Sequence, residues 1–369
     1  MHTSMRFTAL AMLCCAILIQ PVIAQEGPKH EQTETVSPPK PKEDTPKKKA
    51  RRDTPPLPAD VPTFRADTSL VMVDVSVLDK HGNPVPNIPQ EYFRITEDGV
   101  PQEVRTFAQT EAPITVCLVI EFSNRFQQLW SETWHQTLEA AYGFVGALRE
   151  DDLVAVVAYD MQSEILSDFT TDRSQTHEAL QRLRAATFSE ANLFDALADT
   201  VDRLSDIEGR KAVVLISSGI DTFSKLTFDK TRKIVQNAGV PIYAIGLMQA
   251  LREWYDARGY LDSIARLDFL QADNQLRTFT KESGGVAFFP RFYGEFSGIF
   301  KQILQSLRTQ YLVSYTPTNT AKDGKFRKIQ VRLIDPATGR DIKVVDEKGK
   351  DVKYKIIARP GYNAPREVE

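Results

Sequence analysis

The 369-residue chain has only three cysteines, and their positions leave no disulfide to support the fold. Cys14 and Cys15 lie in an apolar N-terminal segment, so a mature chain without this segment keeps Cys117 alone. A single thiol cannot form an intramolecular disulfide, even in an oxidising compartment. Stability must therefore come from packed cores, for which the 42% hydrophobic content is sufficient.

The chain also lacks an excess of charge of either sign. Its 46 basic and 49 acidic residues give a formal net charge of −3. Nucleic-acid binding depends on a basic surface that attracts the phosphate backbone. This composition gives no general electrostatic basis for such a surface, so we expect no nucleic-acid partner.

A long hydrophobic run is missing as well. The apolar run from Phe7 to Ile19 is shorter than the roughly 20 residues that span a bilayer. It follows Arg6 and precedes a short segment ending in Ala24, which is the pattern of a secretory signal peptide. We expect cleavage after Ala24 and an exported product, periplasmic or extracellular, with no membrane span in the mature chain. The alternatives are a buried N-terminal helix or an uncleaved anchor.

Residues 25–63 are rich in proline and lysine and contain few large apolar side chains. Such a composition cannot bury enough surface to offset the entropy of the chain. We expect a disordered linker here.

Two kinds of strand follow, and they predict two kinds of domain. Near both ends of the chain, apolar and polar residues alternate, as in 71–77, 311–315, 329–333 and 352–356, which is typical of half-buried antiparallel sheet. In the middle, continuous apolar runs alternate with amphipathic segments of helical length, for example Ile114 to Ile120 before Leu129 to Leu148. This order predicts a doubly wound, mainly parallel α/β sheet.

The economical arrangement is one antiparallel β-sandwich built from residues 64–112 and 311–362, with an α/β domain over 113–310 inserted between them and a tail over 363–369. Either β segment alone would be marginal without disulfides. The alternative is two separate β segments that flank the α/β domain.

Polar residues follow two of the predicted buried strands, in the segments 121–125 and 217–221, and precede a predicted helix at the same edge, in the segment 189–195. Ligands of doubly wound sheets bind at the carboxyl ends of the strands. These segments are therefore the candidate site.

The order of elements and these loops resemble a von Willebrand factor A domain, and the chain after residue 63 resembles an exported bacterial family related to it, of the acidobacterial type. The stretches that carry the resemblance are 79–85, 97–102, Leu193-Phe194-Asp195-Ala196-Leu197, Ser283-Gly284-Gly285, 311–315 and Arg359-Pro360-Gly361-Tyr362.

The resemblance implies a metal-ion-dependent adhesion site that binds Mg²⁺ through an Asp-x-Ser-x-Ser loop, a Thr and a further Asp. In this chain the first position is Glu121, Ser123 is kept, and the last Ser is Arg125. The Thr position falls on Ala191 or Asn192, and the third loop reads Ser217-Ser218-Gly219, with Asp221 beyond it. The site is thus degenerate, and we expect no metal and no other cofactor.

Arg125 is the most informative departure. A guanidinium repels a divalent cation and pairs with carboxylates, so our hypothesis is that Arg125 replaces the charge of the metal beside Glu121 or Asp221. The alternative is that Arg125 points to solvent, as loop arginines commonly do.

Aromatic residues provide a candidate partner surface. The segment 249–273 follows a predicted strand and contains Trp254, Tyr255 and Tyr260, and the first loop and the helix after it add Phe122, Phe126 and Trp130. The alternative is a lid whose aromatic side chains pack locally as core. Trp134 is expected in the core because it lies mid-helix.

Catalytic motifs are missing: the sequence has no Gly-x-Ser-x-Gly, no His-Glu-x-x-His, no phosphate loop and no Cys-x-x-Cys. We therefore expect a non-catalytic adhesion-type module that binds a protein or an envelope polymer. One alternative is a serine hydrolase that uses Ser218 and Asp221. The other is a scaffold whose β-sandwich makes the contacts.

Overall fold

The computed structural model describes residues 70–109, 112–123, 131–183, 188–207, 209–259, 263–292, 294–342, 344–345 and 351–366. The predicted signal peptide and linker lie outside these residues, as do Arg125, Phe126, Trp130 and Tyr260 and the side chain of Trp254.

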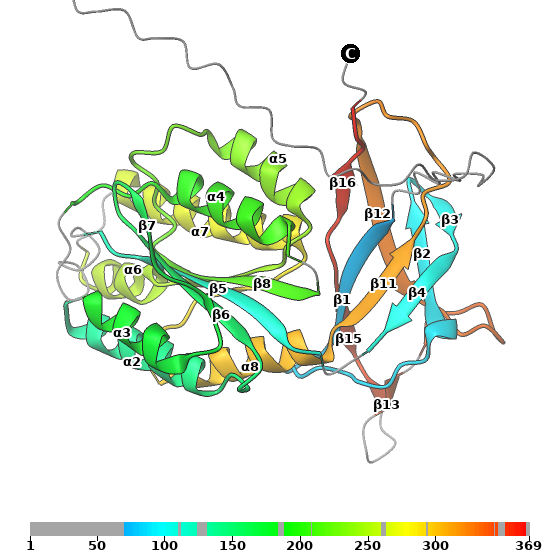
Figure 1. Cartoon of the computed structure of the whole chain (residues 1–369), viewed down its shortest axis with the longest axis horizontal. Helices are drawn as coiled ribbons and strands as arrows, with labels where there is room; N and C mark the ends of the chain where they lie inside the picture. Colours follow the sequence, from blue (N-terminus) through cyan, green and yellow to red (C-terminus); the bar gives the residue numbers. More distant parts are fainter. Residues whose placement is uncertain are drawn as a thin grey trace, which may run out of the picture. The chain divides into compact units, whose positions relative to one another are not determined.

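The continuous apolar runs in the middle of the chain form a six-stranded sheet in the order β10-β9-β8-β5-β6-β7 (Figure 1). Its strands are β5 (Ile114–Glu121), β6 (Leu153–Tyr159), β7 (Ser163–Thr170), β8 (Arg210–Ser217), β9 (Ile242–Gly246) and β10 (Ala287–Phe288). Every pair is parallel except β6 and β7. All eight residues of β5 are buried, as expected for a strand covered on both faces.

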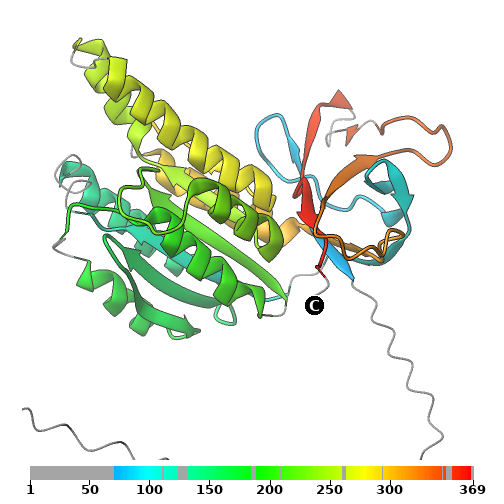
Figure 2. The same ribbon diagram turned by 90° about the horizontal axis from the view of Figure 1, so that it is seen from above.

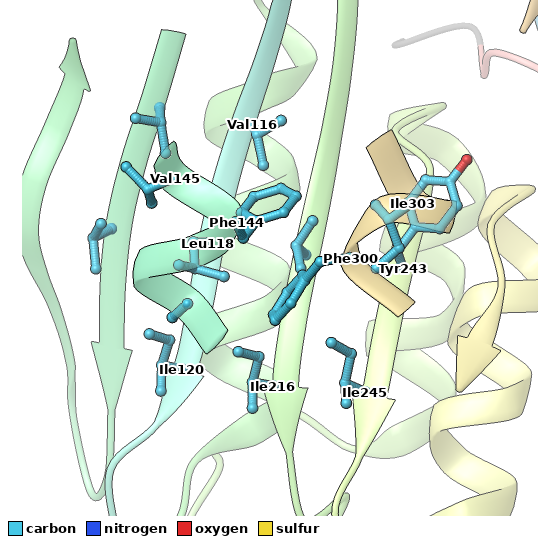
Figure 3. Close-up of a cluster of buried hydrophobic side chains, with 14 of the residues drawn as sticks. Val116, Leu118, Ile120, Phe144, Val145, Ile216, Tyr243, Ile245, Phe300 and Ile303 are labelled. Atoms are coloured by element: carbon cyan, nitrogen blue, oxygen red, sulfur yellow. The ribbon is translucent and has the colours of Figure 1, made fainter. Parts of the chain in front are cut away.

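Helices cover both faces of this sheet (Figure 1). They are α2 (Ser131–Gly146), α3 (Arg173–Arg182), α4 (Leu193–Ser205), α5 (Phe228–Ala238), α6 (Met248–Ala257), α7 (Ser263–Ser283) and α8 (Glu295–Thr309). Side chains of α2, α3 and α8 share one core cluster with the sheet, and those of α4, α5 and α7 share a second. Figure 3 shows Phe144 of α2 and Phe300 of α8 against Val116, Leu118 and Ile216 of the strands, within the first cluster.

The alternating segments at the two ends of the chain form two four-stranded antiparallel sheets, ordered β15-β1-β11-β4 and β16-β12-β2-β3. The strands are β1 (Val71–Asp79), β2 (Phe93–Glu97), β3 (Val100–Gln102), β4 (Val104–Ala108), β11 (Tyr311–Tyr315), β12 (Phe326–Leu333), β15 (Tyr354–Ile357) and β16 (Gly361–Asn363). A short 3₁₀ turn, Gln90–Tyr92, precedes β2, and β13 (Val344–Val345) pairs with β14 (Asp351–Val352).

Both antiparallel sheets combine strands from the two ends of the sequence. In one, β1 pairs with β11 and β15; in the other, β2 pairs with β12. Inward side chains of both sheets share a third core cluster, which includes Val73, Phe93, Tyr311 and Ile329. The predicted fold class is therefore confirmed: a mainly parallel α/β sheet, with an antiparallel sandwich built from the N- and C-terminal segments. The exact domain boundaries stay a prediction.

One further expectation is confirmed. Trp134 is buried, and its indole N–H donates to the Leu183 carbonyl at 3.2 Å. Cys117 is buried in β5, and burial raises the pKa of its thiol to about 12, which suppresses the reactive thiolate.

The segment 249–273, predicted as a binding surface or a lid, is largely helical. It contains most of α6 and the first part of α7, which begins at Ser263. The two form a helical hairpin, yellow-green to yellow in Figure 2, that extends past the neighbouring elements. A partly buried ion pair between Arg252 of α6 and Asp273 of α7, at 2.8 Å, joins the two helices. No helix among the described residues has both the length and the hydrophobicity of a bilayer span.

A buried carboxylate holds the base of the six-stranded sheet, where the chain enters β5 and leaves α8. Asp152 is fully buried and accepts hydrogen bonds from the backbone N–H of Ile114 at 3.0 Å and of Arg149 at 2.7 Å. It also forms an ion pair with Arg308, near the end of α8. One side chain thus joins the first strand, the loop before β6 and the last helix.

A second contact closes the same junction. Arg210 begins β8, and its guanidinium donates to the carbonyl oxygens of Leu307, Arg308 and Gln310 at 3.2, 2.8 and 3.0 Å. The final carbonyls of a helix have no partner within the helix, so a cation at this position satisfies them and also complements the helix dipole.

We predict that Asp152→Ala lowers the free energy of unfolding by about 3–5 kcal/mol, because it leaves Arg308 without its buried partner and two backbone N–H groups without an acceptor. Chemical denaturation measures this. The matched control is Asp168→Ala, which removes an exposed ion pair with Arg203 and should change stability by no more than about 0.5 kcal/mol. Equal losses in the two variants would contradict the prediction.

Candidate functional site

The centre of the candidate site is a buried carboxylate at the end of β5. Glu121 is 2% exposed, and its Oε2 accepts hydrogen bonds from the Ser218 N–H at 2.7 Å, the Ser218 hydroxyl at 2.8 Å and the Ser217 hydroxyl at 3.1 Å. Its Oε1 accepts from the Ser123 hydroxyl at 3.0 Å. The adjacent ends of β5 and β8 thus bring together Glu121, Ser123 and Ser218 of the predicted set.

Tyr159 and Ser217 complete this cluster. Ser217 belongs to the predicted segment 217–221, whereas sequence reasoning missed Tyr159. The Tyr159 hydroxyl, from the end of β6, donates to Ser217 Oγ at 2.7 Å and lies 3.3 Å from Glu121 Oε2. Ser217 Oγ also accepts from the Gly219 N–H at 2.8 Å. The only signal in the sequence is that polar or phenolic residues end two neighbouring apolar runs.

Gly219 is required at the following turn. Its φ is +80°, and a Cβ there would lie 2.7 Å from the Ala272 carbonyl oxygen of α7. Only glycine adopts this conformation without strain and permits the close approach. The hairpin α6–α7 therefore packs directly against the loop that carries Ser218.

Burial dominates the electrostatics of the cluster. Desolvation raises the pKa of Glu121, although the hydrogen bonds from Ser218, Ser123 and Ser217 oppose it. Burial, followed by the proximity of Glu121, likewise raises the pKa of Tyr159. Both groups therefore resist ionisation, and the hydroxyl donors serve to stabilise what charge Glu121 carries.

Asp221 does not join this cluster through any hydrogen bond. Its Oδ1 accepts from the Ser224 hydroxyl at 2.6 Å and from the Phe194 N–H at 3.2 Å, in the first turn of α4. Asp195, in that turn, accepts in return from the N–H groups of Lys225 and Leu226, both at 2.9 Å. This exchange fixes the third loop against α4 and satisfies N-terminal amides that Asn192 leaves uncapped.

Asn192 occupies the position of the family's threonine and carries an unsatisfied acceptor. Its backbone N–H donates to the Asp160 carbonyl at 2.8 Å, but its Oδ1 is buried and accepts no hydrogen bond from the described residues. Ala191, the other possible position, has no polar side chain. An unpaired buried acceptor costs roughly 1–3 kcal/mol, so the site has room for one more donor.

These residues do not fit Mg²⁺. A hard cation needs several oxygen ligands facing it, whereas both oxygens of Glu121 accept hydrogen bonds from protein donors, four of them at Oε2. Asp221 is engaged at the start of α4. Within the described ranges, no group of three or more acidic, histidine or cysteine side chains lies close enough to hold a metal.

The geometry of Ser218 is not that of a nucleophile. Its hydroxyl is 3% exposed, donates to Glu121 and accepts from the Ile220 N–H at 3.1 Å. A catalytic serine needs a base within hydrogen-bond reach and access to substrate. His177 lies on α3, with its ring 5.4 Å from that of Tyr142, and among the described residues the hydrogen-bond partners of the Ser218 hydroxyl are Glu121 and Ile220, not a histidine.

The aromatic candidates fall into two groups. Phe122 is partly buried and packs on Trp134, with ring centroids 5.5 Å apart, and Tyr255 on α6 is partly buried. Phe126, Trp130, Tyr260 and the Trp254 side chain lie outside the described residues, so their place in a partner surface stays a prediction.

A different set of apolar side chains is exposed at the same edge. We call the loops after the carboxyl ends of β5, β6, β8, β9 and β10, with the loop 188–192 that hydrogen-bonds to them, the carboxyl edge. The exposed large hydrophobic side chains there and on α7 are Phe188, Phe223 (52%), Leu267 (64%), Leu270 and Phe292 (71%). Leu267 and Leu270 belong to the segment predicted as a lid or binding surface. The phenylalanines were missed because they are isolated in polar loops.

Residues 116–288 match the family of von Willebrand factor type A domains. This part of the chain belongs to that family, whose fold the six-stranded sheet and its two helical layers reproduce. No curated protein has a matching sequence.

Solved structures of several A-domain proteins are similar at low identity. The von Willebrand factor domain of the type V pilus tip protein Mfa5 from Porphyromonas gingivalis is 14% identical, with a TM-score of 0.41, covering 54% of this chain and 96% of that one. A von Willebrand factor type A protein from Catenulispora acidiphila is 10% identical, with a TM-score of 0.41, covering 82% and 76%. Proximal thread matrix protein 1 from the mussel byssus is 12% identical, with a TM-score of 0.44 over 57% of this chain. The chain spans about half the length of the mussel protein, 50%.

We predict that the raised pKa of Glu121 makes the free energy of unfolding depend on pH, and that Glu121→Gln removes this dependence. Because its folded pKa lies above the ordinary 4.5, the folded state binds the proton more tightly, and stability falls as pH rises from 4.5 to the raised value. Glu121→Gln removes this fall, so its stability relative to the parent should rise by up to about 1.4 kcal/mol per pH unit in that window.

Urea denaturation from pH 4 to 8 measures both curves. Glu164→Gln, at an exposed position on β7, is the control and should run parallel to the parent. Parallel curves for Glu121→Gln as well would show that Glu121 is not perturbed.

Proposed function

We propose that this chain is an exported, metal-independent interaction module, which binds a protein or a cell-envelope polymer through the carboxyl edge of its A domain. The observation that carries the proposal is the distribution of exposed apolar side chains. We consider the described residues of the A domain and of its connection to α8. There, all large hydrophobic side chains that are exposed lie at the carboxyl edge or on α7, except Ile165 on β7.

Exposed apolar side chains gathered at one face are typical of interaction sites, whereas scattered single ones need no explanation. Three of the side chains, Phe188, Phe223 and Phe292, are aromatic, the type most enriched at the centre of protein interfaces. Polar groups of the same edge, including Ser224 and Asp195, are held by hydrogen bonds and so give the surface a fixed shape. A prearranged surface of this kind lowers the entropic cost of binding.

The proposal includes the degenerate metal site. The hydrogen bonds to Glu121 supply locally the stabilisation that a cation supplies in the family's site, and Asn192 Oδ1 is an acceptor still without a donor. We propose that Arg125, two residues after Ser123, contributes the positive charge there. Export rests on the signal pattern of residues 1–24 and on the linker composition after it.

We predict that the mature protein binds neither Mg²⁺ nor Mn²⁺ at micromolar strength, because the oxygens of Glu121 are already occupied by hydrogen-bond donors. Isothermal titration calorimetry with each ion tests this. Micromolar binding that disappears in Glu121→Ala would overturn the metal-free part of the proposal, and the same variant serves as the control for adventitious ions.

We also predict that a photo-cross-linking amino acid at Phe223 captures a partner in the native envelope, whereas the same amino acid at Ile165 does not. Both positions are exposed, 52% and 45%, and both lie in the A domain, but Ile165 is on the edge strand β7. Adduct mass after electrophoresis is the readout.

A third position, Phe326 on β12, tests the scaffold alternative. Adducts at Phe326 alone would assign the contacts to the β-sandwich and contradict the proposal, as would equal adducts at Phe223 and Ile165.

A further inference from the structure

A cavity lies away from the carboxyl edge, at the junction of α5 with the β-sandwich. Its volume is about 290 Å³, and its lining includes Asn237, Thr316, Thr320, Lys322, Arg359 and Tyr362. Small-molecule sites in proteins begin at roughly 300 Å³, so the cavity suits a small ligand. We call it the Arg359 cavity.

The walls of the Arg359 cavity come from both parts of the fold and are tied together. At the end of α5, the Asn237 side-chain oxygen accepts from the backbone N–H of Asn363 at 3.2 Å and from its side-chain amide at 2.8 Å. Tyr362, also on β16, donates its hydroxyl to the buried carboxylate of Glu97 at 3.0 Å. The cavity is therefore a built feature and not a gap between loosely placed loops.

Arg359 supplies an unpaired cation to this cavity. Its guanidinium makes no hydrogen bond or ion pair with any residue that the structure describes, and its Nε is buried without a partner. Its carbon Cζ lies 5.7 Å from the centroid of the Tyr362 ring. Burial lowers its pKa, and the groups that oppose this most are Tyr315 and then Asp74 of β1, both of which act through space only. Buried arginines normally have hydrogen-bond acceptors.

Two glycines hold Arg359 in place. Gly239 and Gly284 follow α5 and α7 with φ of +62° and +84°. A Cβ at Gly284 would lie 2.7 Å from the Arg359 backbone nitrogen, and a Cβ at Gly239 would lie 3.0 Å from its Nη1. The guanidinium is thus fixed beside the C-terminal end of α5, where the helix dipole favours a cation. The dipole compensates part of the charge but leaves the N–H donors without an acceptor.

The described lining residues include no carboxylate, and their polar groups are the Arg359 guanidinium, the Lys322 ammonium, hydroxyls and amides. A guanidinium presents a planar fork of donors that matches a carboxylate with two parallel hydrogen bonds. We propose that the Arg359 cavity binds a small carboxylate, either a free organic acid or the C-terminal carboxylate of a peptide. This site is independent of the function proposed for the carboxyl edge.

The test compares N-acetylglycine with its neutral amide, N-acetylglycinamide, on the mature protein by isothermal titration calorimetry or ligand-observed NMR. We expect saturable binding of the acid and at least tenfold weaker binding of the amide. Arg359→Gln should weaken acid binding at least tenfold. Lys355→Gln, which removes the same charge from an exposed position on β15, should leave it unchanged.

A second variant keeps Arg359 and therefore separates binding from folding. Ala321 lines the cavity and is exposed, so Ala321→Phe fills the space from the rim. It should abolish acid binding while circular dichroism and the melting temperature stay near those of the parent. N-acetyl-triglycine then distinguishes the two sources of the carboxylate. Tighter binding than that of N-acetylglycine indicates a peptide C-terminus, whereas equal or weaker binding indicates a free organic acid.

The proposal is overturned if the acid shows no saturable binding, if acid and amide bind alike, or if acid binding survives in Ala321→Phe. It is also overturned if folded Arg359→Gln and Lys355→Gln weaken binding equally, since the effect would then be general charge and not the guanidinium.

Discussion

The buried carboxylate of Asp152 is the contact on which the two-part architecture depends. It joins Ile114, where the chain enters the α/β sheet, to Arg308, just before the chain leaves it. The strands on either side of the insertion, β4 and β11, are themselves paired, with Ala108 opposite Leu312. An inserted domain is tolerated when its two ends lie close together at the surface. Asp152 fixes that proximity from within the inserted domain, so the sandwich can form across a long sequence separation.

The two ends of the six-stranded sheet differ in how they use charge. At the base, Asp152 is paired with Arg308, and Arg210 with helix carbonyls, so buried charges meet opposite charges or dipoles. At the carboxyl edge, Glu121 meets neutral hydroxyls and a backbone N–H. Neutral donors stabilise a carboxylate less than a cation does, which is why burial prevails there and raises the pKa of Glu121. The buried charges at the base are therefore paired and stabilise the fold, whereas the buried Glu121 carboxylate at the carboxyl edge has no cationic partner among the described residues.

The sequence predicted the fold well because periodicity reports burial directly. Continuous apolar runs identified strands buried on both faces, and alternating ones identified the sandwich. The edge strand β7 was missed because its residues are mostly exposed and carry no such pattern. In the site, the loop positions of Glu121, Ser123 and Ser218 were predictable from the strand ends. The capping of α4 by Asp221 was not, because the partner, Phe194, is brought close only by the tertiary fold.

Charge balance over the whole chain says little about either candidate site. A net charge of −3 is compatible with a buried carboxylate that has only neutral donors and with a buried guanidinium that has no acceptor. The two cases have opposite consequences. Glu121 can relieve its desolvation by taking up a proton, so it needs no ligand. The guanidinium of Arg359 cannot readily lose its proton: burial lowers its pKa, but the ordinary pKa of a guanidinium lies far above neutral pH. The α5 dipole and Asp74 compensate part of the Arg359 charge, and the carboxylate proposed for the adjoining cavity supplies the acceptor that its N–H donors lack.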